Sequence, residues 1–232
     1  MSTFDPFAKD YRIIHDANLR VTGYSSDYFS ARKIREIVRH TVEVDGKLKV
    51  LDLGCGDGLC CHYFRKYLSR AEIYGIDISM ESLISSGNRN IPRGHFSLYD
   101  GLHIPFHNDL FHIVLMANVL HHVYHPEHQK ALLKECRRVL MKKGKLFIFE
   151  HNPLNPITRK LVNDCPFDQG AVLVHFQRLK NILTNVGFNH RWWFFLFFPG
   201  MLNKIEFIER WLRWLPLGAQ YYFICQKKNN SL

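Results

Sequence analysis

The sequence predicts an α/β protein with a doubly wound, mostly parallel sheet and helices on both faces. Strand-like and helix-like stretches alternate from about residue 48 onward. A glycine-rich loop, Gly54–Gly58, follows the first of these strands. The chain has 232 residues, of which 47% are apolar, enough to close one sizeable core.

Short apolar stretches are the predicted strands, and longer stretches between them are the predicted helices. The last of these helices ends at Gly187, which suits that place because glycine tolerates a positive φ. The predicted strands are 49–53, 73–76, 96–98, 113–117, 146–149, 192–198 and 221–225. The predicted helices are 59–68, 80–88, 127–140 and 176–186.

Two segments lie outside this alternation. Residues 1–47 are polar and aromatic, and we expect two or more helices there that form a lid in front of a domain at 48–232. Residues 199–218 are predicted to be a helical insertion between the last two strands. On a helix, this insertion has an aliphatic face (Met201, Ile205, Ile208, Leu212, Leu215), an aromatic flank (Phe207, Trp211, Trp214) and a polar side (Glu206, Glu209, Arg210, Arg213).

The net charge and the cysteine content limit the binding partners and the cellular compartment that can be expected for the protein. The formal net charge of +10 permits attraction to nucleic acid, anionic lipid or acidic metabolites without choosing among them. The six cysteines lack the paired spacing of a zinc site and the density of a disulfide scaffold. The sequence shows no secretory signal and no apolar run long enough to span a bilayer. We therefore expect a cytoplasmic protein with reduced thiols.

The loop Gly54-Cys55-Gly56-Asp57-Gly58 is the predicted ligand site. A strand that stops there and restarts as a helix places bare backbone at the carboxyl end of the sheet, where open α/β folds bind ligands. The third glycine comes one residue earlier than in the dinucleotide fingerprint, and Asp52 and Asp57 flank or lie within the loop. These carboxylates would repel phosphate but suit a positively charged ligand, such as the ammonium and sulfonium of S-adenosylmethionine.

Asp77 follows the second strand, 21 residues after Gly56. A carboxylate at this point can accept hydrogen bonds from both hydroxyls of a ribose. The alternative interpretation is that Asp77 only caps the following helix. The glycine loop and the acid together favour a nucleoside ligand.

Five motifs in sequence order resemble those of class I S-adenosylmethionine-dependent methyltransferases, in their small-molecule, type 11-like branch. The resemblance covers at least residues 48–150, and it implies a seven-stranded sheet with an antiparallel last strand. It departs from the family pattern at His112, where aspartate is frequent, and at Lys143 and Lys145. The matching motifs are Val50–Gly58, Gly75–Ser79, Tyr99–Gly101, Phe111–Val114 with Asn118–His122, and Arg138–Lys145.

The same resemblance implies how S-adenosylmethionine is bound. Asp77 would hold the ribose, and Ile78 would pack on the adenine. The methionine portion would lie against Gly54, Cys55 and Gly56 beside Asp52, with backbone near Asn118 at its end, and the turn Asp100-Gly101 would bind the adenine amine.

The N-terminal segment also resembles small-molecule methyltransferases. The pattern Phe4-Asp5-x-x-Ala8-x-x-Tyr11 is similar to their aromatic lid, in which Tyr11 is the first candidate and Tyr28 the second. The alternative is that these aromatic residues simply dock the helices on the sheet.

His121, His122, Glu150 and His151 are the candidate catalytic residues because they fall at the carboxyl ends of the fourth and fifth strands. The sulfonium is already an activated donor, so alignment of the acceptor and exclusion of water are the main requirements. If a base is used, His122 is the first choice, since histidine has an ordinary pKa of about 6.5. The alternative role is packing against the cofactor loop. No metal is expected, because no carboxylate or cysteine near His121-His122-x-x-His125 completes a ligand set.

The predicted reaction is methyl transfer to an oxygen, nitrogen or carbon of a small or lipid-like acceptor. A non-catalytic, cofactor-binding interaction subunit is the alternative. An RNA methyltransferase is disfavoured, because Asn118-Val119-Leu120-His121 stands in place of the Asp/Asn-Pro-Pro-aromatic turn of base methyltransferases. The apolar face of 199–218 has four candidate partners: its own domain, the acceptor, a second subunit or a membrane surface. The oligomeric state is not predicted.

Overall fold

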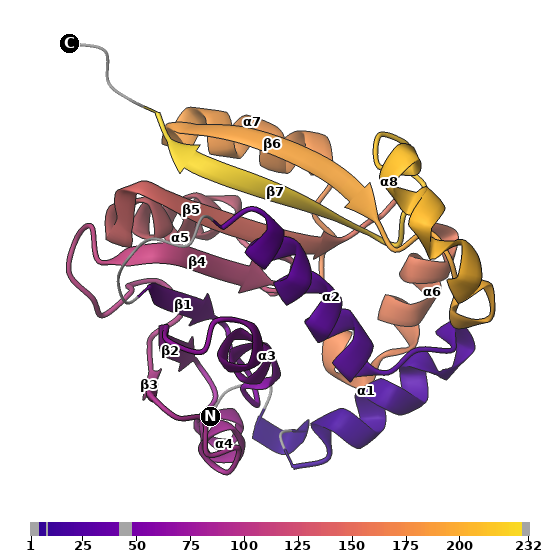
Figure 1. Ribbon diagram of the computed structural model, residues 1–232, viewed down its shortest axis with the longest axis horizontal. Helices are drawn as coiled ribbons and strands as arrows, with labels where there is room; N and C mark the ends of the chain where they lie inside the picture. The colour runs from indigo at the N-terminus through magenta and orange to yellow at the C-terminus, as the bar shows by residue number, and fades with distance from the viewer. Residues whose placement is uncertain (1–4, 8, 42–47, 229–232) are drawn as a thin grey trace.

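The computed structural model describes residues 5–7, 9–41 and 48–228. In this part of the chain, seven strands form one sheet in the order β3-β2-β1-β4-β5-β7-β6 (Figure 1). Within this sheet β7 runs opposite to the other six strands, which share one direction. The predicted doubly wound sheet with an antiparallel last strand is therefore confirmed. The strands are β1 (Lys49–Leu53), β2 (Glu72–Asp77), β3 (Gly94–Leu98), β4 (Phe111–Ala117), β5 (Leu140–His151), β6 (Phe188–Phe195) and β7 (Gln220–Lys227).

Helices cover both faces of the sheet, and short 3-10 segments lie between several of the elements. The α-helices are α1 (Tyr11–Leu19), α2 (Ser26–Arg39), α3 (Leu59–Tyr67), α4 (Met80–Gly87), α5 (Pro126–Val139), α6 (Pro156–Asp164), α7 (Phe176–Val186) and α8 (Glu209–Leu212). The 3-10 turns are η1 (Asp5–Phe7), η2 (Arg20–Thr22), η3 (Leu120–His122), η4 (Pro166–Asp168) and η5 (Gly200–Ile208).

Two apolar clusters, one on each face, hold the helices to the sheet. On one face, α2, α3 and α4 bury residues such as Ile34, Phe64 and Leu83. On the other face, α5 and α7 bury residues such as Leu132 and Leu183. Because both faces of the central sheet are covered, β1, β2, β4 and β7 are mostly buried, whereas the edge strands β3 and β6 are partly exposed.

The structure moves one predicted element and adds another. β6 begins at Phe188 instead of Trp192 and ends at Phe195, because its polar first half also pairs with β7. Helix α6 was not predicted, although Asn155 caps it and Pro156 occupies its first turn. The end of α7 at Gly187, where φ is +92°, confirms the predicted stop.

The 199–218 insertion does not form the single amphipathic helix that its sequence predicts. The segment forms η5, which is kinked at Leu202, and the short helix α8 instead of one helix. Glu206, Glu209 and Arg213, from its expected polar side, are directed at α2, where they meet arginine and glutamate partners. The aromatic residues are exposed instead. Ion pairs with α2, and not the apolar face, therefore determine which side of this segment faces the rest of the molecule.

The N-terminal segment forms η1, α1, η2 and α2, as expected of a helical region. Parts of the predicted lid, residues 1–4 and 42–47 as well as Ala8, lie outside the described residues, and Phe4 is among them. In Figure 1, α1 lies with α6 and the η5–α8 segment on one side of the molecule. No helix in the described ranges is both long and apolar enough to cross a bilayer.

Candidate active site

A cavity of about 390 Å³ opens at the carboxyl ends of β1, β2, β4 and β5. Its walls include the glycine loop after β1, the turn after β4 and the last residue of β5. Helix α1 and the turn η4 supply further walls from outside the sheet. The residues that line it include Tyr11, Asp52, Gly54, Cys55, Gly56, Asp77, Ile78, Gly101, Asn118, His121, His122 and His151. Most of the predicted site residues thus meet at one place.

The glycine loop has the shape that its sequence predicts. Gly54 and Gly56 have φ of +72° and +53°, in the left-handed region that favours glycine. A Cβ at position 54 would lie 2.6 Å from the Val119 side chain, so the loop is pressed against the turn after β4. A Cβ at position 56 would meet nothing within 4 Å, because Gly56 borders open space in the cavity.

Asp77 fastens the glycine loop to the end of β2. Its Oδ2 accepts a hydrogen bond from the Gly56 amide at 2.8 Å, and its Oδ1 accepts one from the Ser79 amide at 2.9 Å. The cap of α4 is Ser79, which rules out the alternative that Asp77 is the N-cap. Burial raises the pKa of Asp77 from its usual value. Each carboxylate oxygen has a second lone pair, so Asp77 can still accept hydrogen bonds from a ribose.

The two other acids of the loop have different partners. Asp52 is buried, accepts a hydrogen bond from the Cys61 thiol at 3.2 Å, and burial raises its pKa to about 7. Asp57 is paired with Arg12 of α1 and with Arg89. The expectation that Asp57 offers its charge to a cationic ligand is therefore wrong, because two guanidinium groups already neutralise it. Asp57 instead ties α1 to the loop.

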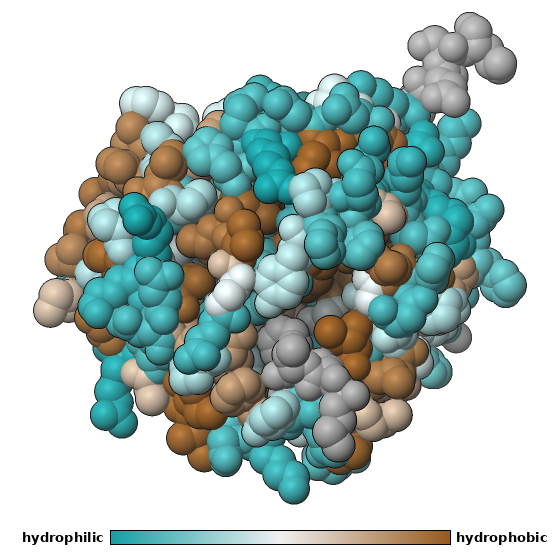
Figure 2. Space-filling model, turned by 180° about the vertical axis from the view of Figure 1, so that it is seen from behind, coloured by the Kyte–Doolittle hydropathy of each residue, from teal (hydrophilic) through white to brown (hydrophobic). Residues whose placement is uncertain are grey.

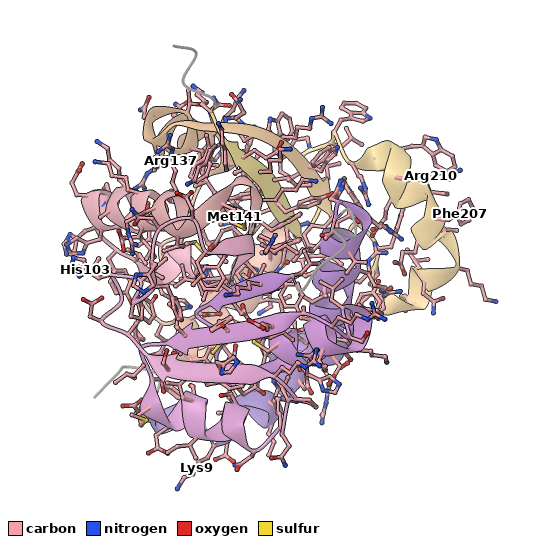
Figure 3. All side chains as sticks on the ribbon, turned by 60° about the vertical axis from the view of Figure 1, so that its left-hand side comes forward. Lys9, His103, Arg137, Met141, Phe207 and Arg210 are labelled. Carbon is pink, nitrogen blue, oxygen red and sulfur yellow. The ribbon has the colours of Figure 1, made fainter. Side chains whose placement is uncertain are left out.

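The predicted adenine side is only partly assembled. Ile78 lines the cavity, and a Cβ on Gly101 would lie 3.4 Å from its side chain. Asp100 is not among the residues that line the cavity. Its oxygens instead accept hydrogen bonds from the amides of Leu102 and His103 and from the His103 ring, which lies at the surface in Figure 3. The contact of Asp100 with adenine stays a prediction, one that requires this turn to open.

Aromatic residues close the cavity from the N-terminal side. Tyr11 packs against Phe167 of η4 with 4.6 Å between ring centroids, and both line the cavity. Tyr28, the second lid candidate, does not line it and stacks on Tyr24 at 3.8 Å. For Tyr28 the helix-docking alternative describes the structure. Asn118 has a φ of +58° and donates its amide hydrogen to Phe149, which turns the chain along the cavity wall.

Lys33 is a site residue that no pattern in the sequence indicated. Its side chain is only 5% exposed, yet it lines the cavity. Burial lowers its pKa, and no carboxylate of the described residues lies within ion-pair distance of its ammonium group. A buried cation without a partner is costly, so this wall suits the carboxylate of an amino-acid ligand. A ligand with a methionine portion fits this donor.

His121 and Glu150 form a fully buried pair at the opposite end of the cavity. The distance from His121 Nδ1 to Glu150 Oε2 is 2.6 Å, and Glu150 Oε1 accepts hydrogen bonds from the amides of Val119 and Leu120. Burial alone would lower the pKa of His121, but the carboxylates of Glu150 and Asp168 outweigh it and raise the pKa to about 9. His121 therefore carries a proton at neutral pH and is a poor base.

His122 is joined to a residue that the sequence analysis missed. Its Nε2 lies 3.3 Å from Asp168 Oδ1, and the same oxygen is 3.8 Å from His121 Nε2. Burial lowers the pKa of His122 from its ordinary value, so the ring is neutral at neutral pH. Burial also lowers the pKa of His151 to about 3, helped by the charge on His121. Asp168 lies in η4, far along the chain, and no motif marked it.

These side chains also form a set that could hold a metal. Nitrogen atoms of His121 and His122 and an oxygen of Asp168 all lie within 4.8 Å of one another. The expectation that no carboxylate completes such a set is wrong, because η4 brings Asp168 to the histidines. Ion pairing accounts for the arrangement without a metal, since the protonated His121 lies between Glu150 and Asp168.

Comparisons with known proteins assign the family. The family model for a methyltransferase domain matches residues 51–148. Demethylmenaquinone methyltransferase from Thermotoga maritima is 28% identical over 155 residues, which are 67% of this chain and 62% of that protein. Ubiquinone biosynthesis O-methyltransferase from Idiomarina loihiensis is 32% identical over 115 residues, which are 48% of this chain and 45% of that protein. The chain thus covers less than two thirds of the length of either relative.

A solved structure extends the likeness to the whole fold. The S-adenosylmethionine-dependent methyltransferase from Archaeoglobus fulgidus superposes with a TM-score of 0.67 at 20% identity, over 88% of this chain and 95% of that one. Residues 51–148 of this chain therefore carry a methyltransferase domain, and the fold is that of class I S-adenosylmethionine-dependent methyltransferases. S-adenosylmethionine is the cofactor of the family, S-adenosylhomocysteine is its product, and the family requires no metal.

The family model matches most of the cofactor side of the site but only part of the side where the histidines and acids meet. It includes the glycine loop, Asp77 and the two adjacent histidines. It ends before Glu150, His151 and Asp168. The family assignment therefore supports the cofactor half of the site, and the acceptor half rests on geometry.

Proposed function

We propose that this methyltransferase domain moves the methyl group of S-adenosylmethionine to an oxygen, nitrogen or carbon atom of a small acceptor, with His122 as general base. The observation that carries the proposal is the contact of His122 with Asp168 inside the cavity that also contains the glycine loop and Asp77. A base must lie within reach of the acceptor proton and be neutral at working pH. His122 lies in this cavity with an 18% exposed side chain and a lowered pKa, which supports this assignment.

The residues of this chain have separate tasks in the proposed reaction. When bound, S-adenosylmethionine supplies a methyl group on a sulfonium, and the acceptor atom forms a bond to that carbon as the bond to sulfur breaks. In the neutral His122 ring, the hydrogen on Nε2 faces Asp168, so Nδ1 holds the lone pair that takes the acceptor proton. The Asp168 carboxylate then stabilises the imidazolium. The protonated His121, held by Glu150, keeps Asp168 in place.

Residues 1–47 act as a lid over residues 48–232 in this proposal. Arg12 bonds Asp57 of the glycine loop, and Tyr11 packs on Phe167, so both ends of the cavity are tied to α1. A ligand that enters must part these contacts, and their closure afterwards excludes water from the sulfonium. Asp52 and Lys33 complete the binding of the methionine portion, as partners for its ammonium and its carboxylate.

A small acceptor is supported by the relatives, whose names refer to demethylmenaquinone and to ubiquinone biosynthesis. We propose an acceptor of this small, lipid-like class and no nucleic acid, and a cytoplasmic location. The alternative of a cofactor-binding subunit without turnover differs in one measurable respect, because it would bind S-adenosylmethionine and methylate no acceptor.

Calorimetry with S-adenosylmethionine tests the cofactor half of the proposal. Wild-type protein is expected to bind, and Asp77→Ala to bind about 100-fold more weakly, because charged hydrogen bonds of about 1.5–3 kcal/mol each are lost. Asp109→Ala, at an exposed acid outside the cavity, is the matched control and should bind normally. Wild-type protein that shows neither heat nor a thermal shift would refute the proposed cofactor site. Turnover is then measured with quinols and other small phenolic, amine and carbon acids.

A further inference from the structure

The segment between β6 and β7 presents large apolar side chains to solvent. We call six of them the aromatic surface. Met201 is 87% exposed, Trp214 70% and Phe207 63%. In Figure 3, the labelled Phe207 extends away from the body of the molecule. The aromatic surface consists of Met201, Leu202, Phe207, Trp211, Trp214 and Leu217.

The acidic side chains of this segment are turned inward. Glu206 and Glu209 both pair with Arg32 of α2, and Glu209 also accepts a hydrogen bond from the Phe197 amide at 2.8 Å. Arg213 donates to both carboxylate oxygens of Glu36 at 2.8 and 3.0 Å. These contacts fix the orientation of η5 and α8, so the outward position of the aromatic residues is imposed by the fold.

The charges that remain outside are positive. Lys204 and Arg210 are exposed, and they are accompanied by no exposed acid in 200–218. The Arg210 guanidinium lies 3.9 Å above the Trp211 ring. An arginine stacked on an aromatic ring keeps its charge available to an anion while its stem covers apolar surface.

The aromatic surface continues onto two neighbouring elements. A Cβ on Gly23, next to η2, would lie 3.3 Å from Gly200, and Asn155 of α6 donates a hydrogen bond to the Leu217 carbonyl at 2.7 Å. Exposed Val21 and Ile157 lie close to these two contacts in sequence. Figure 2 shows hydrophobic residues gathered on the left of the view, the side on which η5 and α8 lie after the rotation from Figure 1.

We infer that the aromatic surface docks on a bilayer that contains anionic phospholipid. Tryptophan and phenylalanine with arginine and lysine suit the boundary between acyl chains and headgroups. The sign of the exposed charge and the net charge of +10 match an anionic headgroup layer. A second copy of this chain fits less well, because a twofold contact would enclose two copies of Lys204 and Arg210 with no exposed acid of 200–218 to pair with them.

A second cavity lies between the active site and the two ends of the segment that carries this surface. It has a volume of about 70 Å³ and shares His15, Lys33 and Asp168 with the main cavity. Its walls also include Leu196 and Ala219, the residues at the two ends of the 197–218 segment. A lipid-like acceptor held at the bilayer would therefore lie on the same side of the molecule as this second cavity. This last step rests on the proposed function, whereas docking itself does not.

Flotation with vesicles tests the docking surface. Full-length protein is mixed with phosphatidylcholine vesicles or with vesicles that also contain phosphatidylglycerol, without cofactor or acceptor. Wild-type protein is expected to float with the mixed vesicles. Trp214→Glu should lower the partition coefficient at least about tenfold, since it removes a large apolar side chain that docking would bury and adds a charge that anionic lipid repels. Lys204→Ser with Arg210→Ser should remove the preference for phosphatidylglycerol, a loss of about tenfold or more.

Ile84→Glu is the matched control, because Ile84 is 53% exposed on α4, away from the η5–α8 segment. It should float like wild type, and all variants should bind S-adenosylmethionine with unchanged affinity. Absence of flotation with both vesicle types, or equal losses for Trp214→Glu and Ile84→Glu, would overturn the inference. A dimer in light scattering that Trp214→Glu dissociates would also overturn it, by showing that a second copy covers the surface. Methyl transfer can fail or succeed independently of each of these results.

Discussion

The two ends of the main cavity are held together in different ways. At the cofactor end, Asp77 bonds backbone amides of the glycine loop and of the turn after β2. At the acceptor end, ionised side chains from β5, η3 and η4 bond one another. The first arrangement depends mainly on backbone shape. The second depends on a specific distribution of protons among His121, His122, Glu150 and Asp168, so it should be the part that pH and charge substitutions disturb.

His122→Gln should break the acceptor end while leaving the cofactor end intact. Loss of a general base is expected to lower kcat by about 10²–10⁴-fold, because no side chain then takes the proton of the methyl-accepting atom in the transition state. The affinity for S-adenosylmethionine should stay within about twofold of wild type, as the glycine loop and Asp77 are untouched. Single-turnover rates and calorimetry on the same preparation measure both quantities. A variant with unchanged kcat and normal folding would remove His122 from the mechanism.

Asp168→Asn should reveal the proton distribution at the acceptor end. In wild type, the pKa of His121 is raised from 6.5 to about 9, so its contribution to stability is complete below about pH 6.5 and is lost as pH rises through about 9. Without the Asp168 charge, that loss should occur at lower pH, and kcat should fall about tenfold because His122 is less well held.

The pH dependence of the free energy of unfolding measures the shift caused by Asp168→Asn. Asp164→Asn is the control, because Asp164 is an exposed acid one turn of chain away and pairs only with Lys160 among the described residues. If both variants lose stability over the same alkaline range as wild type, Asp168 does not set the charge on His121.

Arg12→Gln should have the smallest effect, because it weakens one link between the lid and the cofactor end. Asp57 keeps Arg89 as a partner, so we expect KM for S-adenosylmethionine to rise only about fivefold, with kcat nearly unchanged. Hydrogen exchange of the α1 amides should become faster. Lys9→Gln, at an exposed lysine just before α1 that Figure 3 labels, provides the control. Unchanged exchange in Arg12→Gln would show that this pair does not hold the lid.

The comparison also explains which parts of the site the sequence could predict. Gly54, Gly56 and Asp77 act through local backbone geometry. Such geometry can be predicted from the residue types and their spacing along the chain. The strands were predictable for the same reason, since burial on both faces makes each a short apolar run. The histidines were predictable only as residues at the ends of strands.

Other features depend on contacts between distant segments. Asp168 lies in a short turn, and only the folded structure brings it into contact with His122. Lys33 has the sequence context of an ordinary surface lysine of a helix, and it becomes buried only because α2 packs on the sheet. Glu206 and Glu209 were placed in solvent by their helical period, but Arg32 lies across the fold from them. Secondary-structure propensity and hydrophobic periodicity describe one segment at a time, so they cannot predict ion pairs between segments that are distant in the sequence.

The chain between β6 and β7 leaves the sheet and returns through a narrow neck. The Ala219 amide donates to the Leu196 carbonyl at 3.0 Å, and a Cβ on Gly218 would lie only 2.5 Å from the Phe195 carbonyl oxygen. This closure brings the two ends of the segment together beside the paired ends of β6 and β7. The segment is thus a loop with a closed base that is anchored to α2 through Arg32 and Glu36, and substitutions at its exposed aromatic residues can alter the outer surface without touching the sheet that carries the glycine loop.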